Sequence, residues 1–246
     1  MRLAFSLCLF AAMAGAQDRS FLACPIVRDT KTVPCYLAEY EGELYFLGIQ
    51  QDITAAFHPP QLKHQVLVEG RASEGPRVCG GIPLKPLSIS VVKEVDPACT
   101  TLLPAEPGIE APPAARGAGP ASGPLTGPPP RVEALSGRQE FTALYAFNDD
   151  FVDYAAIATV QRAAGYATKI KASAVKVMGY RATTVLSNGE RLVEKPGLAE
   201  KRAQAIATLL EGSGVAAVSA DWKEEPEPGD GKADPSRRRV TITVVP

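Results

Sequence analysis

Three short segments decide the fold of the second half of this 246-residue chain. They are residues 172–179 (ASAVKVMG), a predicted strand; residues 198–210 (LAEKRAQAIATLL), with apolar side chains at helical spacing; and residues 239–245 (RVTITVV), a predicted closing strand. Between the first two lies 183–194, TTVLSNGERLVE, in which Asn188-Gly189 separates two apolar pairs. Such an Asn-Gly pair favours a hairpin whose turn residues take positive φ. We interpret 183–194 as a hairpin inserted between a strand and a helix.

The neighbouring segments complete a mixed α/β pattern. A strand is predicted over 140–147, and the polar residues 148–150 are expected to cap a helix over 151–164 that Gly165 ends. Gly212 ends the second helix, and a strand over 216–222 precedes the closing strand. The order strand, helix, strand, hairpin, helix, strand, strand predicts a two-layer α/β sandwich over 138–246.

This sandwich resembles the OmpA-like C-terminal domain family at three motifs. The family closes a strand with Gly-His-Thr-Asp, and this chain has Gly179, Tyr180, Arg181 and Ala182 there. The family opens a helix with Asn-x-x-Leu-Ser-x-x-Arg-Ala, and this chain has Lys195, Leu198, Ala199, Arg202 and Ala203 there. The last strand of the family begins Asn-Arg-Arg-Val, and this chain has Arg237, Arg238, Arg239 and Val240 there. The resemblance is confined to the C-terminal domain.

The resemblance implies a periplasmic module that binds peptidoglycan. In the family, the aspartate and the helix arginine hold the ammonium and the carboxylate of diaminopimelate. Here Ala182 removes the acid, and losing one charge-assisted hydrogen bond weakens binding roughly 10- to 100-fold. Arg202 can still bind a carboxylate with Arg181 beside it, and Glu194 is a candidate replacement acid. The candidate ligand-binding residues are Gly179, Tyr180, Arg181, Glu194, Leu198, Arg202 and Arg239.

Two of these predictions have plainer structural alternatives. Arg202 can be a surface arginine whose stem packs on the domain and whose head group binds nothing. The run Arg237-Arg238-Arg239 can be a solvated edge, because alternation along a strand sends adjacent side chains to opposite faces. The solvated edge is the favoured interpretation of that run.

The first half carries four cysteines beyond a predicted signal peptide: Cys24, Cys35, Cys79 and Cys99. An even number of cysteines in an exported chain favours two disulfides. Four cysteines allow three pairings, and short loops favour Cys24–Cys35 with Cys79–Cys99 without deciding the matter. A zinc site that also uses His58 and His64 is the alternative, but the spacing matches no common zinc pattern.

Four β-rich segments predict a small all-β domain over 17–103, for which a partly open barrel is one arrangement, stapled because its core is modest. They lie at 35–41, 43–48, 65–71 and 88–94. Such barrels sometimes bind glycans or nucleic acid on one face, and four aromatic residues are available for stacking: Tyr36, Tyr40, Tyr45 and Phe46. Packing inside the domain is the favoured interpretation of these aromatics. Scattered cationic residues argue against nucleic acid.

The remaining segments predict export and a two-domain layout. Residues 1–16 have the basic start, apolar run and small-residue cleavage site of a signal peptide. No other segment approaches the roughly 20 apolar residues of a membrane-spanning helix. Residues 104–137, rich in Pro, Gly and Ala, predict an extended linker. With the family resemblance, these features predict a location in the periplasm of a Gram-negative bacterium, associated with the cell wall or outer membrane.

We therefore predict a non-catalytic cell-envelope protein whose C-terminal domain associates with peptidoglycan while its β domain contacts another envelope component. The alternative is an OmpA-like domain that serves as a protein–protein interaction module without binding peptidoglycan. The sequence has no Ser/His/Asp arrangement, no paired carboxylates on a known scaffold and no metal signature, so we predict neither an enzyme nor a cofactor.

Overall fold

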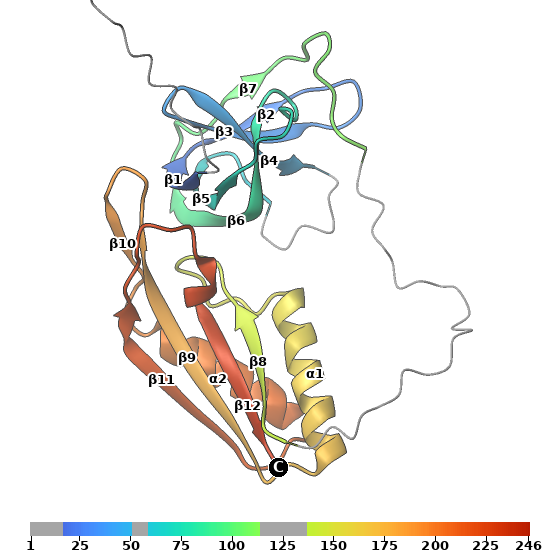
Figure 1. Ribbon diagram of the computed structural model, residues 1–246, viewed down its shortest axis with the longest axis vertical. Coiled ribbons are helices and arrows are strands. Elements are labelled where there is room, and N and C mark those ends of the chain that lie inside the picture. Colours follow the sequence, from blue (N-terminus) through green and yellow to red (C-terminus); the bar gives the residue numbers. More distant parts are fainter. Residues whose placement is uncertain (1–16, 51–58, 114–136) are drawn as a thin grey trace, which may run out of the picture.

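A computed structural model describes residues 17–50, 59–113 and 137–246 (Figure 1). The described residues up to 113 form a seven-stranded sheet, here called the N-terminal unit. Residues 137–246 form a five-stranded sheet with two helices, here called the C-terminal unit. The predicted signal peptide, His58 and most of the predicted linker lie outside the described residues.

The N-terminal unit contains the four predicted strands and three further strands. Its strands are β1 (Asp18–Ala23), β2 (Pro25–Arg28), β3 (Cys35–Tyr40), β4 (Glu43–Ile49), β5 (His64–Ala72), β6 (Ile82–Val95) and β7 (Leu102–Leu103). They are arranged in the order β1-β5-β6-β4-β3-β2-β7. The strands β1, β2 and β7 were not predicted, because their short mixed segments lack alternation of apolar and polar residues.

This sheet curls so that distant strands share one core. Phe21 of β1 stacks on Tyr40 of β3 with ring centroids 4.7 Å apart, although three strands separate β1 from β3 in the sheet. Tyr45 of β4 is 2% exposed in the same cluster. Tyr36 and Phe46 also pack against the unit's hydrophobic clusters. The aromatic side chains therefore fill the interior, which agrees with the favoured interpretation.

The disulfides join Cys24 to Cys99 and Cys35 to Cys79, so the pairing favoured by loop length is wrong. Strand pairing decides the connectivity instead. The parallel pairing of β7 with β2 brings Cys99 beside Cys24, which directly precedes β2. Cys79 lies in the turn before β6, which pairs with β4 next to the strand that Cys35 begins.

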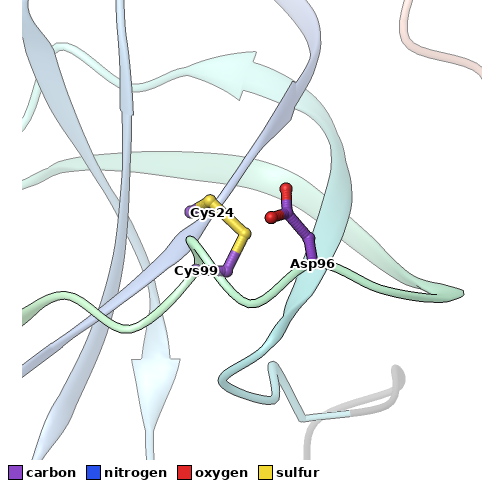
Figure 2. Close-up of side chains that lie close together, drawn as sticks. All are labelled: Cys24, Asp96 and Cys99. Carbon is purple, nitrogen blue, oxygen red and sulfur yellow. A yellow bond between two sulfur atoms is a disulfide. The ribbon is translucent and has the colours of Figure 1, made fainter.

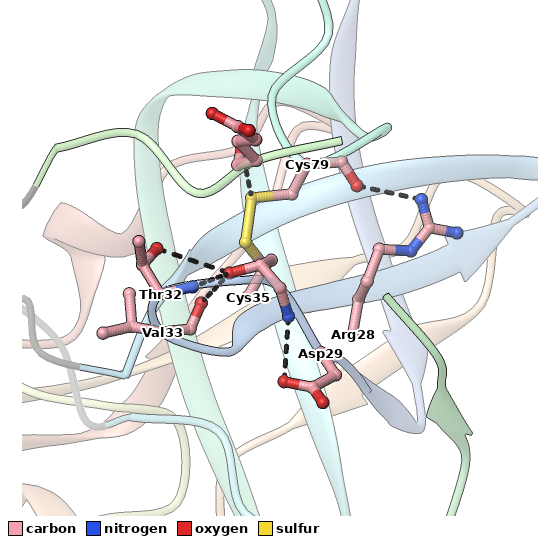
Figure 3. The surroundings of a disulfide bond; sticks show 8 residues. Arg28, Asp29, Thr32, Val33, Cys35 and Cys79 are labelled. Atoms are coloured by element: carbon pink, nitrogen blue, oxygen red, sulfur yellow. Dashed lines mark hydrogen bonds between the residues drawn. A yellow bond between two sulfur atoms is a disulfide. The ribbon is translucent and has the colours of Figure 1, made fainter. Parts of the chain in front are cut away.

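The start of the predicted linker packs beside the Cys35–Cys79 disulfide, whose surroundings are drawn in Figure 3. Arg28 donates a hydrogen bond to the Cys79 carbonyl at 3.2 Å and pairs with Glu106 at 3.4 Å. Ile109 packs against the cluster around the disulfide. Residues 104–113 thus lie against the N-terminal unit.

The C-terminal unit is a sheet covered on one face by two helices (Figure 1). Its elements are β8 (Gln139–Leu144), α1 (Tyr154–Ile170), β9 (Ala174–Val185), β10 (Arg191–Val193), α2 (Leu198–Gly212), β11 (Val218–Glu227), the short 3₁₀ helix η1 (Pro235–Arg237) and β12 (Arg239–Val245). The strand order is β10-β9-β12-β8, and β11 pairs in parallel with β9. Alternation in β12 sends Val240, Ile242 and Val244 into the core beneath the helices, where each is 0% exposed. The predicted mixed α/β fold is therefore present.

Helix α1 differs from its prediction at both ends. Asp153, rather than the 148–150 segment, caps the helix by accepting a hydrogen bond from the Ala156 N–H at 2.7 Å. The helix continues through Gly165 to Ile170, because Tyr166 and Ala167 beyond the glycine are buried in the core. Lys171 ends it in the left-handed region at φ 53°. Packing therefore outweighs the helix-breaking tendency of one glycine.

The predicted hairpin is formed by β9 and β10, which pair antiparallel with Val185 opposite Arg191. The Gly189 N–H donates to the Leu186 carbonyl at 2.8 Å, and Gly189 has φ 88°. Asn188 does not have positive φ, so the turn needs one left-handed residue and not the two predicted. Neither described helix has the length and apolar composition required to cross a membrane.

Candidate functional site

Arg202 is the centre of the predicted pocket, and it lies in the second turn of α2 with 0% of its surface exposed. Gly179 of β9 makes this position possible, since a Cβ at that residue would overlap the Ala199 carbonyl of α2. The helix therefore lies close enough for the guanidinium to reach the end of the sheet. Three carbonyl oxygens accept hydrogen bonds from it: those of Asp149 (2.8 Å), Tyr180 (3.1 Å) and Ala146 (3.2 Å).

Glu194 supplies the remaining partner of Arg202. Its carboxylate lies 2.6 Å from one terminal nitrogen of Arg202 and 3.1 Å from the other, and the Glu194 side chain is also 0% exposed. Backbone N–H groups of Ala182 (2.9 Å) and Asn148 (3.0 Å) donate to the same carboxylate. The negative charge that Ala182 removes from the family motif is thus present, but it comes from the end of the inserted hairpin.

The hydrogen-bonding capacity of this pair is fully used. A guanidinium has five N–H donors, and the five hydrogen bonds of Arg202 employ all of them. Each carboxylate oxygen of Glu194 accepts one hydrogen bond from Arg202 and one from a backbone N–H. In this arrangement neither group offers an interaction to a ligand from outside.

Arg181 converges on the same region but contacts backbone and not the buried carboxylate. It donates to the Glu194 carbonyl at 2.6 Å and to the Glu224 carbonyl at 2.5 Å. Its Nε also lies 3.3 Å from the Glu224 carboxylate. Arg181 therefore ties the segment after β10 to β11 and supports the position of Glu194.

The other four candidate residues contribute no side-chain hydrogen bond to the Arg202–Glu194 pair, although the Tyr180 carbonyl accepts one from Arg202. Gly179 and Leu198, which is 6% exposed, serve the packing of α2. Tyr180 lies on the opposite face of β9 from Gly179, where the guanidinium of Arg239 sits 4.1 Å from its ring centroid. Arg239 also pairs with both carboxylate oxygens of Glu227, at 2.8 and 3.0 Å.

Sequence reasoning missed two residues of the pocket. The ring of Tyr145 lies 4.8 Å from the guanidinium carbon of Arg202, and burial raises the pKa of this tyrosine. Asn148 has φ 55°, and its side-chain oxygen accepts a hydrogen bond from the Lys195 N–H at 2.8 Å. The tolerance of asparagine for positive φ was the available signal, since 148–150 was interpreted as a helix cap.

Two segments border the pocket, and β6 of the N-terminal unit contacts both. On the 146–149 segment, the Phe147 N–H donates to the Ser90 hydroxyl at 2.8 Å, and Asp149 pairs with Lys93 at 2.9 Å. Hydrogen bonding to Asp149 raises the pKa of Lys93. On the 194–195 segment, Lys195 pairs with Glu94 at 2.9 Å. The N-terminal unit thus holds both borders of the pocket.

A second buried ion pair joins the two units directly. Arg238, just before β12, contacts both carboxylate oxygens of Glu69 on β5 at 2.5 and 3.1 Å. Arg238 is 0% exposed and Glu69 is 1% exposed. The interpretation of the arginine run as a solvated edge is therefore wrong for Arg238. Its partner Glu69 belongs to the other unit, and residue spacing along the sequence does not predict such a contact.

The inserted hairpin makes a third contact between the units. At its tip, the Ser187 N–H donates to the Ser20 carbonyl at 2.7 Å, and the Ser20 N–H donates to the Ser187 hydroxyl at 2.9 Å. Ser20 lies on β1, at the edge of the N-terminal sheet. The hairpin tip therefore holds the edge of the other unit by a reciprocal pair of hydrogen bonds.

Cys24, Asp96 and Cys99 lie together, but they do not form a free metal site (Figure 2). The two sulfur atoms are joined in a disulfide, which leaves no thiolate to bind a metal. The Asp96 carboxylate accepts hydrogen bonds from the Gln65 amide and the Ala98 N–H, both at 3.0 Å. These three residues are structural.

No protein-family model matches the chain, and no curated protein matches it. Solved structures that are similar to part of this chain include an OmpA-like domain and a MotB-like protein. One is the OmpA-like domain of FopA1 from Francisella tularensis subsp. tularensis SCHU S4, with 19% identity and a TM-score of 0.33 over 44% of this chain and 73% of that one. Another is a MotB-like protein from Desulfovibrio vulgaris, with 13% identity and a TM-score of 0.34 over 44% of this chain and 76% of that one.

Proposed function

We propose that this chain is a non-catalytic, exported cell-envelope protein whose OmpA-like unit is a docking module for protein surfaces, with its own N-terminal unit as the first partner. The observation that carries the proposal is the Arg202–Glu194 pair, in which both side chains are 0% exposed and mutually saturated. In the docked form, Arg202 has a structural role and does not hold peptidoglycan.

The inserted hairpin supports a docking function. It contributes Glu194, which fills the pocket, and Ser187, which holds the N-terminal unit. One insertion thus occupies the ligand position that the family resemblance implies and adds a protein contact beside it. This combination favours the protein-interaction alternative over direct wall binding through Arg202.

Peptidoglycan binding through Arg202 would require a different arrangement of the side chains in the pocket. A diaminopimelate carboxylate would have to displace Glu194, and its ammonium would need an acid that remains free. Glu194 is the acid at the pocket, and it is already bound to Arg202. Glu194 therefore competes with the carboxylate of the ligand for Arg202, and Arg202 competes with the ammonium of the ligand for Glu194.

Sedimentation with purified peptidoglycan sacculi tests the proposal on the full mature chain. We expect the same amount of protein in the pellet with and without sacculi. Saturable pelleting that free meso-diaminopimelate competes away would contradict the proposal. A Glu200→Gln variant is a suitable control for handling effects, because Glu200 lies on the outer side of α2 and bonds to Gln204.

A further inference from the structure

We propose that the N-terminal unit is an autoinhibitory clamp, which keeps the Arg202 pocket shut for as long as the two units are docked. The inference rests on the proposed function, namely that the pocket is closed in the docked form. It adds that release of the N-terminal unit lets the two bordering segments part, so that Glu194 leaves and Arg202 accepts a carboxylate from outside.

The first support is the position of the clamp. Of the contacts that hold the pocket's borders, those of Ser90 and Lys93 act on the 146–149 segment, and that of Glu94 acts on the 194–195 segment. All three residues belong to the C-terminal half of β6. One strand of the N-terminal unit therefore bridges both sides of the pocket, and the separation of the units removes both restraints together.

The second support is that the same two segments position Glu194. The Asn148 N–H of the first segment donates to the Glu194 carboxylate, and the Asn148 side chain accepts from the Lys195 N–H of the second. Asn148 thus ties the two segments to each other within the C-terminal unit, while β6 ties them from the N-terminal unit. A shift of the 146–149 segment withdraws one of the four donors of the carboxylate and two carbonyl partners of Arg202.

The third support is the polar character of the contact between the units. Each of the three hydrophobic clusters among the described residues is confined to one unit. The units meet instead through ion pairs and hydrogen bonds, with Glu69–Arg238 as the most deeply buried pair. Units with separate cores and a polar contact can separate without unfolding.

Glu69→Gln in the full mature chain tests the clamp, because it keeps the shape of the side chain and removes the charge opposite Arg238. Glu74→Gln is the matched control, since Glu74 is exposed on the same unit. We expect Glu69→Gln to enlarge the radius of gyration in X-ray scattering. We also expect hydrogen exchange at the Ala182 and Asn148 amides to become faster by about tenfold or more, which corresponds to a loss of about 1.4 kcal/mol of protection. Glu74→Gln should change neither quantity.

A locked variant shows whether separation causes the opening. Adding Ser20→Cys and Ser187→Cys to Glu69→Gln joins the hairpin tip to β1, and the resulting disulfide should restore slow exchange at both amides. Lys93→Gln, at an exposed position that leaves both cores intact, should by itself speed the exchange of Asn148. This second variant keeps the test decisive even where Glu69→Gln fails to fold.

Separated units with unchanged amide exchange would overturn the clamp, and so would units that stay docked in Glu69→Gln. Sacculi and meso-diaminopimelate serve as the ligand probes. Binding by Glu69→Gln but not by the wild type supports both proposals, whereas binding by neither overturns the clamp and leaves the docking function standing. Equal binding by wild type and Glu69→Gln overturns the docking proposal as well as the clamp.

Discussion

Arg202 and Glu194 form a buried ion pair that fills the predicted pocket. A buried ion pair gives little net stability, because desolvation of both charges offsets their attraction. Removal of one partner is costly, since the other charge then stays buried without compensation. The buried charge of Arg202 therefore depends on the Glu194 carboxylate for compensation. Any ligand that replaces Glu194 has to make the same contacts with Arg202.

Glu194→Gln is expected to lower the free energy of unfolding by about 3–5 kcal/mol, because it leaves the Arg202 charge uncompensated. Glu200→Gln, which changes the same group on the adjacent helix, should stay within about 0.5 kcal/mol of the wild type. Urea denaturation followed by circular dichroism measures both values. A loss below about 1 kcal/mol for Glu194→Gln would refute the buried-pair description, since surface pairs contribute no more than that.

Tyr145 offers a second test at the residue scale. Among the described residues its buried hydroxyl has no hydrogen-bond partner, whereas the Tyr166 hydroxyl donates to the Gly137 carbonyl at 2.9 Å. Tyr145→Phe should therefore leave stability within about 0.5 kcal/mol of the wild type, and Tyr166→Phe should cost about 0.5–1.5 kcal/mol. Thermal unfolding of the two variants side by side gives the comparison. The reverse order of stability would show that Tyr145 has a strong polar partner.

At the scale of elements, Gly165 and Gly189 have different roles in the structure. The sequence predicts that Gly165 ends a helix and that Gly189 forms a hairpin turn. Gly165 lies inside α1, where an added methyl group would meet no atom within 4 Å apart from the adjacent backbone of the helix itself, while Gly189 has φ 88° in the hairpin turn. Alanine suits a helix interior better than glycine by roughly 0.5–1 kcal/mol. At positive φ the same substitution introduces strain.

Gly165→Ala is accordingly expected to raise the midpoint of thermal unfolding, and Gly189→Ala to lower it. The two substitutions add the same methyl group, so the local backbone alone accounts for a difference in sign. Differential scanning calorimetry of both variants measures the two shifts. A destabilising Gly165→Ala would mean that α1 is interrupted at Gly165, as the sequence had suggested.

Element type and order were predictable from the sequence in the C-terminal unit, because strands such as β12 and helices such as α2 carry regular apolar patterns. In the N-terminal unit, β1, β2 and β7 were not predicted. The ends of α1 were not, since the burial of Tyr166 is a tertiary effect. The disulfide pairing followed strand order, which loop lengths do not encode. In the site, the family resemblance identified Arg202. Glu194 was predicted as the replacement for the acid that is missing at Ala182. Glu69 could not be found, because it lies 169 positions from Arg238 in the sequence.

At the scale of the whole molecule, two buried ion pairs have separate roles. Arg202–Glu194 closes the pocket within the C-terminal unit, and Arg238–Glu69 attaches the N-terminal unit to it. Since no hydrophobic cluster of the described residues spans both units, the second pair has a large share in their docking.

A double-mutant cycle on the second pair should show this dependence. We expect Arg238→Leu to destabilise the docked form relative to separated units by about 3–5 kcal/mol, because docking would leave Glu69 buried without its counter-ion. The double variant Arg238→Leu with Glu69→Leu should recover part of that loss, since neither charge remains. Arg237→Leu, at a neighbouring and partly exposed position, is the control and should cost about 1 kcal/mol or less. Additive losses in the cycle would argue against a direct pair.

The most direct test of the closed pocket is the side-chain signal of Arg202 itself. In the protein labelled with ¹⁵N-arginine, the Arg202 Nε–H resonance can be assigned by its disappearance in Arg202→Lys. The Glu194-filled pocket predicts a slowly exchanging proton whose chemical shift does not move when meso-diaminopimelate is titrated to millimolar concentration. A saturable shift of that resonance in the docked wild-type protein would show that Arg202 is open to this added compound and would contradict the closed pocket.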